Sequence, residues 1–265
     1  MPTPPVFANA LGIKSLYHYE KFRADRLSAT LRDQRIYCSD PSNLNDPWDC
    51  FPTLDPEPLK DPATFRHAMD WLHSHASAPL RGDLKLELEN RIRTDEVYAQ
   101  QFLKGLCDAI EKMIVARRIY CLTPDPCCIL MWSHYAENHS GICLEFATDK
   151  NPFISAMKVR YQTTYPQWIS TISSETGMDM ALTKSQCWEY EQEFRVFSTG
   201  SALPSVYHTV QGNRLPLAEG ALTAVIAGCR ANYEEITATV RAHAPALPVK
   251  RAVKVDHRFE LQIVN

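Results

Sequence analysis

Glycine is scarce in this chain of 265 residues, and its spacing limits what the chain can fold into. The nine glycines stand at least eight residues apart, while proline occurs 18 times. Loops that wrap a phosphate need glycines close together, because only a residue without a side chain lets the backbone approach the ligand so tightly. Neither G-x-G-x-x-G nor G-x-x-x-x-G-K-[ST] can be written anywhere in the sequence. This excludes a Rossmann dinucleotide fold and a P-loop nucleotide hydrolase.

Charge and hydropathy narrow the choice of partners. Lysine and arginine number 28 against 31 aspartates and glutamates, which gives a formal net charge of −3. Such a chain has no general positive field, so a nucleic-acid partner would need a local basic patch. No apolar run approaches the roughly 18 residues that span a bilayer, and the start of the chain lacks the basic flank and apolar core of a signal peptide. We expect a cytoplasmic protein with no membrane partner.

The nine cysteines are an odd number with no C-x-x-C pair, which favours free thiols over disulfides in such a protein. Five possible metal ligands lie close in sequence but lack the paired spacing that is typical of a zinc site. They are Cys121, Cys127, Cys128, His134 and His139. We expect no bound metal.

Residue patterns predict an α+β fold. Residues 15–19 are aromatic and β-prone, residues 23–34 have the spacing of a helix, and residues 35–39 form a second strand. Residues 40–49 are rich in Asp, Pro, Ser and Asn, which indicates a turn-forming loop and a candidate binding loop. Helix formers dominate residues 60–117, and short β-type runs follow them.

Strands that flank a helical block, without regular alternation, favour a mixed or antiparallel central sheet. We expect a single catalytic-type domain over residues 1–265, with an inserted helical subdomain at about residues 60–117.

Candidate site residues lie on both early strands and in the loop after them. His18 stands between two tyrosines on the first strand, and alternation turns it to the face opposite theirs. Tyr37 lies two residues before Ser39 on the next strand, and Asn45 and Asp46 follow in the loop. The structural alternatives are a histidine at a sheet edge, a packed tyrosine and loop side chains that only cap turns.

Three glutamates alternate late in the chain, at Glu189, Glu191 and Glu193. If this segment is a strand, all three share one face, which must be a solvated rim or a site, because a buried carboxylate needs a partner. Arg195 would share that face and could pair with one of them. The alternative is an exposed edge strand that uses charge against aggregation.

The segment around His134 and Tyr135 also carries a serine, Asn138 and His139. No G-x-S-x-G elbow exists, which argues against a serine nucleophile. The two histidines are five residues apart and do not share one helical face, so they make a poor metal pair.

Four ordered motifs, LYHY, PSNLNDPWD, WSHYA and WEYEQEFR, resemble those of a widespread bacterial family known only as a domain of unknown function. The order of histidine strand, helix, tyrosine strand and late E-x-E also resembles the NAD-dependent ADP-ribosyltransferase superfamily. Residues 16–18 and 35–40 echo the branch named for its His, Tyr and Glu, with Tyr19 and Arg35 where that branch has glycine. Residues 191–193 are similar to the E-x-E of the branch whose first-strand residue is arginine.

The second resemblance implies a sheet of the ADP-ribosyltransferase type and NAD as substrate. It assigns Glu193 to the ribose, where a carboxylate stabilises the oxocarbenium-like cation left when nicotinamide departs. It assigns Glu191 to orienting or deprotonating the acceptor. The implied NAD-binding residues are His18, Tyr19, Tyr37, Ser39, Asn45 and Asp46, with His18 on the adenosine-side ribose or the amide and Tyr37 stacked on nicotinamide. His134 and Tyr135, which have no counterpart in that scheme, are expected on the acceptor side.

The sequence thus predicts a NAD-dependent ADP-ribosyltransferase that modifies a nucleic acid or a protein, as a bacterial toxin or anti-phage defence effector with a cognate inhibitor. Hydrolysis of NAD without an acceptor is a variant of the same chemistry. Two alternatives stay open. One is a metal-dependent hydrolase or nuclease using His18, His134 and the glutamate segment, and the other is a non-enzymatic binding module.

Overall fold

The chain was described with a computed structural model that covers residues 4–50, 61–75, 82–164, 174–199, 208–209 and 212–265. Its contacts divide it into two compact units. The helical unit comprises residues 1–4, 41–116 and 160–186, and the sheet unit comprises residues 5–40, 117–159 and 187–265. The single domain over the whole chain stays a prediction.

The helical unit contains three helices in the range where the sequence predicts a helical block. Its elements are η2 (Pro41–Asn43), α2 (Pro62–His75), α3 (Gly82–Thr94), α4 (Glu96–Val115), β6 (Arg160–Gln162), α6 (Ser174–Ala181) and β7 (Thr183–Ser185), with β6 parallel to β7. Phe65 and Met69 lie one turn apart on α2, and both are buried. Phe65 contacts Phe102 of α4, with 6.4 Å between the ring centroids. No described helix of the chain combines the length and apolar character needed to cross a bilayer.

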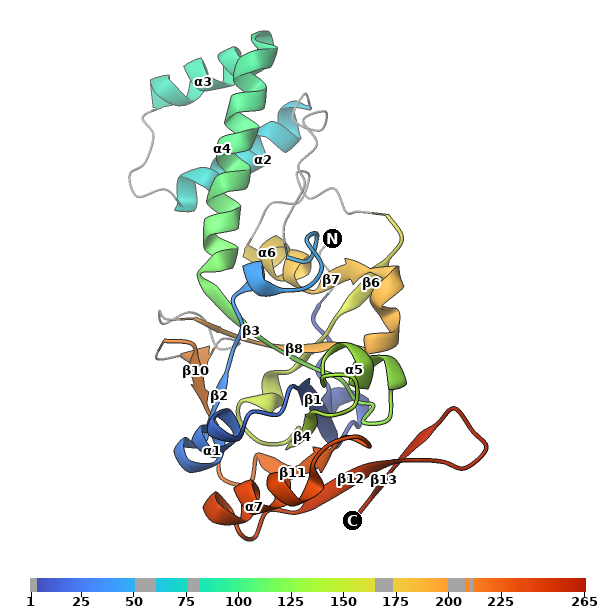
Figure 1. Cartoon of the computed structure of the whole chain (residues 1–265). Helices are drawn as coiled ribbons and strands as arrows, with labels where there is room; N and C mark the ends of the chain where they lie inside the picture. Colours follow the sequence, from blue (N-terminus) through green and yellow to red (C-terminus); the bar gives the residue numbers. More distant parts are fainter. Residues whose placement is uncertain (1–3, 51–60, 76–81, 165–173, 200–207, 210–211) are drawn as a thin grey trace. The chain divides into compact units, whose positions relative to one another are not determined.

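The larger sheet of the sheet unit is mixed, as the sequence predicts. Its strand order is β1 (Ser15–Glu20), β4 (Ile142–Ala147), β11 (Leu222–Ala227), β12 (Val249–Lys254) and β13 (Leu261–Val264). The pair β11–β12 is parallel and the other pairs are antiparallel. Helices α1 (Ala24–Asp33) and α7 (Tyr233–His243) contact each other beside this sheet (Figure 1). The mixed α+β fold class is therefore confirmed.

A second sheet joins the first through one isolated bridge. It contains β3 (Arg117–Leu122), β8 (Phe194–Thr199), β5 (Met157–Lys158) and β9 (His208–Thr209), and β2 (Arg35–Tyr37) pairs separately with β10 (Arg214–Pro216). Tyr17 of β1 bridges to Thr123 just after β3, and Ser39 after β2 bridges to Ile119 of β3. The backbone of β3 thus lies beside both early strands that carry predicted site residues.

Among the described residues, two hydrophobic cores lie on opposite faces of the larger sheet, since Leu144 and Val225 belong to one and Cys143 and Ile226 to the other. Tyr120, Leu122, Phe194 and Val196 alternate along β3 and β8 and belong to the larger core, which also takes Leu27 of α1. The smaller core lies against α5 (Ile129–His134) and includes Tyr19, Trp132, Cys143 and Ile226. Because side chains alternate across a strand, a residue's core tells which face of the sheet it occupies.

The late glutamate segment is not the continuous strand that the sequence suggests. Residues Gln186–Glu191 form the 3₁₀ helix η6, and β8 begins only at Phe194. Between them Gln192 has a φ of 46°, which breaks an extended conformation. The partner strand β3 ends at Leu122, opposite Phe194, so no ladder reaches the residues before β8. The prediction that Glu189, Glu191 and Glu193 share one strand face is therefore wrong.

Replacing Gly141 by alanine is expected to lower the free energy of unfolding by about 2 kcal/mol. The new Cβ would lie 2.4 Å from the backbone oxygen of Glu20 and 2.9 Å from the backbone of Ala136, which cannot move aside as a side chain can. Gly105→Ala in α4 is the matched control, because its Cβ meets nothing within 4 Å and alanine favours a helix. Urea unfolding followed by circular dichroism measures both. Equal stability of the two variants would contradict the close packing at Gly141.

Candidate functional site

His18 is held by the backbone of the neighbouring strand. Its Nδ1 lies 2.7 Å from the carbonyl oxygen of Cys121, and its ring stacks on Tyr120 with 4.2 Å between centroids. Tyr17 and Thr123 exchange both backbone hydrogen bonds, so the carbonyl of Cys121, two residues earlier, faces the same way. A carbonyl only accepts, so Nδ1 carries the proton and donates, which leaves Nε2 as an acceptor.

The pKa of His18 is lowered to about 4, mainly by burial and also by the positive charge of Arg26, while the hydrogen bond to Cys121 opposes the shift. The imidazole is therefore neutral at physiological pH. Burial likewise raises the pKa of the Glu20 carboxyl, which the Arg26 guanidinium opposes.

Arg26 connects His18 to Tyr37. Its guanidinium lies 3.2 Å from the Glu20 carboxylate and 5.5 Å above the centre of the Tyr37 ring. Tyr37 is 45% exposed, and its hydroxyl accepts a hydrogen bond from the side-chain amide of Asn213 at 3.0 Å. We call His18, Glu20, Arg26, Tyr37 and Tyr120 the His18 cluster.

Sequence reasoning missed Glu20 and Arg26. Glu20 lies two residues after His18 on β1 and so on the same face, a signal that was readable from the strand pattern. Arg26 had no such signal, because its contacts depend on how α1 packs beside β2.

Two other predicted NAD-binding residues of the sheet unit lie nearby but contribute differently. Ser39 exchanges both backbone hydrogen bonds with Ile119, at 2.8 and 2.9 Å, and so anchors the end of β2 beside Tyr120. Tyr19 lies on the face opposite His18, where its hydroxyl donates to the carbonyl of Asp125 at 2.7 Å and its ring meets Trp132 edge-on. The structure therefore does not bring Tyr19 into the His18 cluster, because neighbouring strand residues point to opposite faces.

Asn45 and Asp46 belong to the helical unit. The Asp46 carboxylate is buried and accepts a hydrogen bond from the backbone N–H of Trp48 at 3.0 Å, which is an Asx turn. Asn45 is exposed. For Asp46 the structure thus bears out the alternative of a turn-capping side chain.

Glu193 forms a buried ion pair with Arg195. The carboxylate oxygens accept from Nε at 2.7 Å and from an η nitrogen at 2.8 Å, and both side chains are almost fully enclosed. Arg195 lies opposite Cys121 in the β3–β8 ladder, on the face away from Tyr120 and His18. Glu193 is thus engaged with Arg195, and the expectation that it acts on the ribose beside His18 stays a prediction.

Glu191 meets the two residues that the sequence assigns to the acceptor side. The hydroxyl of Tyr135 donates to the Glu191 carboxylate at 2.6 Å, although the residues are 56 positions apart. His134 Nδ1 lies 3.0 Å from the hydroxyl of Tyr190, which is the residue before Glu191. We call His134, Tyr135, Tyr190 and Glu191 the tyrosine cluster. It packs with the smaller core, so it lies on the face opposite His18.

Within the described residues, no group of three or more His, Cys, Asp or Glu side chains is placed to hold a metal ion. The eight cysteines whose side chains are described are free thiols, and burial raises the pKa of Cys38 to about 12.

Comparison with known proteins relates the middle of the chain to one family. Residues 131–196 match the model of a family described as a protein of unknown function (DUF2971). No curated protein matches the chain. No solved structure matches it either. The matched stretch contains the whole tyrosine cluster and the ion pair of Glu193 with Arg195.

The stability of the protein is expected to fall as the pH drops from about 6.5 to about 4. Between these pH values the His18 imidazole is protonated in the unfolded state but stays neutral in the folded state, because its pKa is 6.5 when unfolded and about 4 when folded. The loss approaches about 3 kcal/mol below pH 4. Urea unfolding at a series of pH values measures it, and His18→Gln should flatten the curve in this window. A curve of the same shape in both proteins would rule out His18 as the source.

Glu193→Gln is expected to lower the free energy of unfolding by about 3 kcal/mol, because glutamine lacks the negative charge that pairs with the buried guanidinium of Arg195. The control is Asp33→Asn, which removes the carboxylate of the exposed ion pairs with Arg32 and Arg214 and should leave the free energy of unfolding almost unchanged. Urea unfolding at pH 7 compares the two variants. A loss for Glu193→Gln no larger than the control would contradict the enclosed pair.

Proposed function

We propose that the protein cleaves the bond between nicotinamide and ribose in NAD at the His18 cluster and transfers ADP-ribose to an acceptor. The observation that carries the proposal is the position of Arg26, whose guanidinium contacts the Glu20 carboxylate and the Tyr37 ring and lies close enough to His18 to lower its pKa. Arg26 therefore links a carboxylate and an exposed aromatic ring and lies near a neutral imidazole.

Each member of the cluster suits one part of NAD. The half-exposed ring of Tyr37 stacks on nicotinamide. The free Nε2 of His18 accepts a hydrogen bond from a ribose hydroxyl, because Nδ1–H is already committed to the Cys121 carbonyl. Arg26, whose side chain is 45% exposed, pairs with the pyrophosphate.

Cleavage needs a carboxylate near the sugar. When the C1′–N bond breaks, its electron pair leaves with nicotinamide and the ribose becomes an oxocarbenium-like cation, which the acceptor then attacks while its proton passes to a base or to water. Glu20 is the carboxylate on the same strand face as His18, and it stabilises that cation electrostatically.

Glu193 suits this role less well than its sequence position suggests. Its two oxygens already hold the guanidinium of Arg195, and separating an enclosed ion pair costs several kcal/mol, on the order of 3–5. Glu191 accepts the hydroxyl of Tyr135 on the far face. We therefore assign neither residue to the ribose.

The chain order of a histidine strand, a helix and a tyrosine strand supports a sheet of the ADP-ribosyltransferase type. In the sheet unit these are β1, α1 and β2, with α1 bringing Arg26 over Tyr37. Transfer to an essential nucleic acid or protein would make the chain a toxin or a defence effector.

The test measures nicotinamide release and label transfer with NAD carrying ³²P in its ADP-ribose part, in bacterial extract. Glu20→Gln is expected to slow release by about a hundredfold, because a preorganised charge is lost. Tyr37→Phe keeps the ring and should retain activity, whereas Tyr37→Ala should raise KM for NAD. Treating the labelled extract with nuclease or protease identifies the class of acceptor.

Glu191→Gln is the matched control, since glutamine still accepts from Tyr135 and the residue lies outside the His18 cluster. It should release nicotinamide at the parent rate. Absence of release by the parent protein in every extract would overturn the proposed function. Loss of activity in Glu191→Gln with activity kept in Glu20→Gln would instead overturn the choice of carboxylate.

A further inference from the structure

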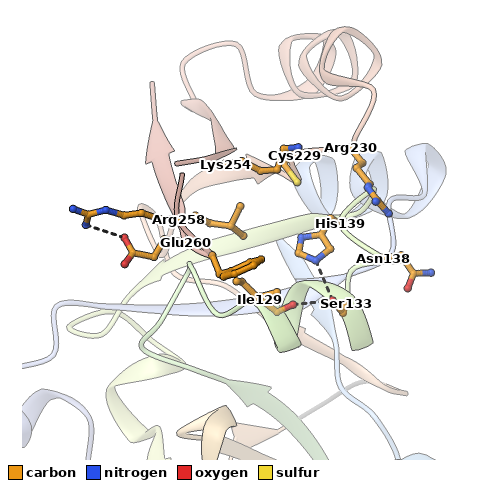
Figure 2. A pocket seen from close by; sticks show the side chains of 11 residues that line it. Ile129, Ser133, Asn138, His139, Cys229, Arg230, Lys254, Arg258 and Glu260 are labelled. Carbon is orange, nitrogen blue, oxygen red and sulfur yellow. Dashed lines mark hydrogen bonds and ion pairs between the residues drawn. The ribbon is translucent and has the colours of Figure 1, made fainter. Parts of the chain in front are cut away.

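The sheet unit contains a cavity of about 450 Å³ that includes no residue of the His18 cluster. Figure 2 shows its wall, which comes from α5, the loop that follows α5, the segment after β11 and the β12–β13 hairpin. The residues that define its chemistry are Ser133, His139, Arg230, Lys254, Arg258 and Phe259.

The loop after α5 has a backbone conformation that side chains seldom adopt. Glu137, Asn138 and His139 follow one another with φ values of 51°, 54° and 71°. The backbone N–H of His139 donates to the carbonyl of Trp132 at 3.1 Å, and a Cβ on Gly228 would lie only 2.2 Å from the His139 oxygen. Three strained residues in a row, fixed by tight packing, are typical of a ligand site.

His139 brings an unsatisfied polar atom to this place. The hydroxyl of Ser133 donates its single hydrogen to the carbonyl of Ile129 at 2.9 Å, so His139 Nε2–H donates to that hydroxyl at 3.0 Å (Figure 2). Burial and the charge of Arg230 lower the pKa of His139, which keeps the ring neutral. Its Nδ1 is a buried acceptor without a hydrogen-bond partner among the described residues.

The cavity is positively charged in a chain whose net charge is −3. Arg230 and Lys254 are exposed at its wall, and neither has an acidic partner in the part of the chain that the structure describes. Arg258 lies 3.5 Å from the carboxylate of Glu260. Three cations against one carboxylate leave two positive charges, which favours a ligand that carries phosphate.

Phe259 adds an aromatic ring to these cations. It lies between Arg258 and Glu260 in the hairpin and is 99% exposed, so its ring contributes almost no buried apolar surface to the stability of the fold. An exposed ring beside cations is the arrangement on which unpaired bases stack. Because almost the whole ring faces solvent, Phe259 can stack on a base that lies outside the cavity. A ligand that contacts both the cavity and Phe259 must therefore be longer than one nucleotide.

We infer that this cavity binds single-stranded nucleic acid. Arg230 and Lys254 hold the phosphates, one nucleotide enters the cavity, and a neighbouring base stacks on Phe259. This binding goes beyond the proposed function, because it requires no NAD.

Fluorescence anisotropy of the full chain with labelled twelve-nucleotide oligothymidine and oligouridine tests the inference in the absence of NAD. Arg230→Gln combined with Lys254→Gln is expected to weaken binding at least about tenfold and to reduce its salt dependence. Phe259→Ala should weaken binding about fivefold or more through lost stacking. The control combines Lys14→Gln with Arg241→Gln, which removes the same charge from exposed positions outside the cavity wall and should bind as the parent does.

Three outcomes would overturn the inference. One is no binding of either oligonucleotide, and another is equal weakening by the control pair, which would indicate diffuse charge attraction. The third is binding of AMP or of a duplex as tight as that of the single strand. Glu20→Gln should bind the oligonucleotides normally, so a failed transferase assay and a failed binding assay are separable.

Discussion

The backbone of strand β3 is the element on which the rest of the sheet unit depends. One edge pairs with β8 along the whole strand. On the other edge, isolated bridges join Tyr17 to Thr123 and Ser39 to Ile119. Between these bridges the carbonyl of Cys121 accepts the hydrogen bond of the His18 imidazole. The same strand places Tyr120 in the larger core, where its ring stacks on that of His18.

Two ion pairs of the sheet unit differ in how far they are exposed to solvent. The Glu20–Arg26 pair keeps an arginine side chain that is 45% exposed, whereas the Arg195 side chain is fully enclosed with Glu193. An enclosed pair holds its geometry but offers no charge to a ligand, because desolvation already balances its attraction. In the exposed pair, Arg26 can leave Glu20 and bind a charged group of a ligand instead. For this reason we place the proposed reaction at the early strand and not at the late glutamates.

The sequence allowed local structure to be predicted better than contacts between distant segments. The unit from β1 to β2 followed from periodicity and strand propensity, and the helical block from its apolar spacing. The E-x-E strand failed because a strand needs a neighbour, and nothing in residues 186–193 reveals that β3 ends at Leu122. The alternation of side chains along a strand did predict that Arg195 could pair with one of the glutamates, and it pairs with Glu193. The cavity was not, since Ser133, Arg230 and Lys254 are brought together only by the packing of separate elements.

Most of the described residues with a left-handed backbone conformation are not glycines. Within the described residues, seven non-glycine positions and three glycines have positive φ. Glycine at such turns would relax the folded state but enlarge the unfolded ensemble, and proline restricts that ensemble further. A glycine-poor, proline-rich sequence therefore loses less backbone entropy on folding and stores more strain in its native turns. At Gln192 and at residues 137–139 the turn therefore carries a polar side chain at its tip, where a glycine would expose only backbone.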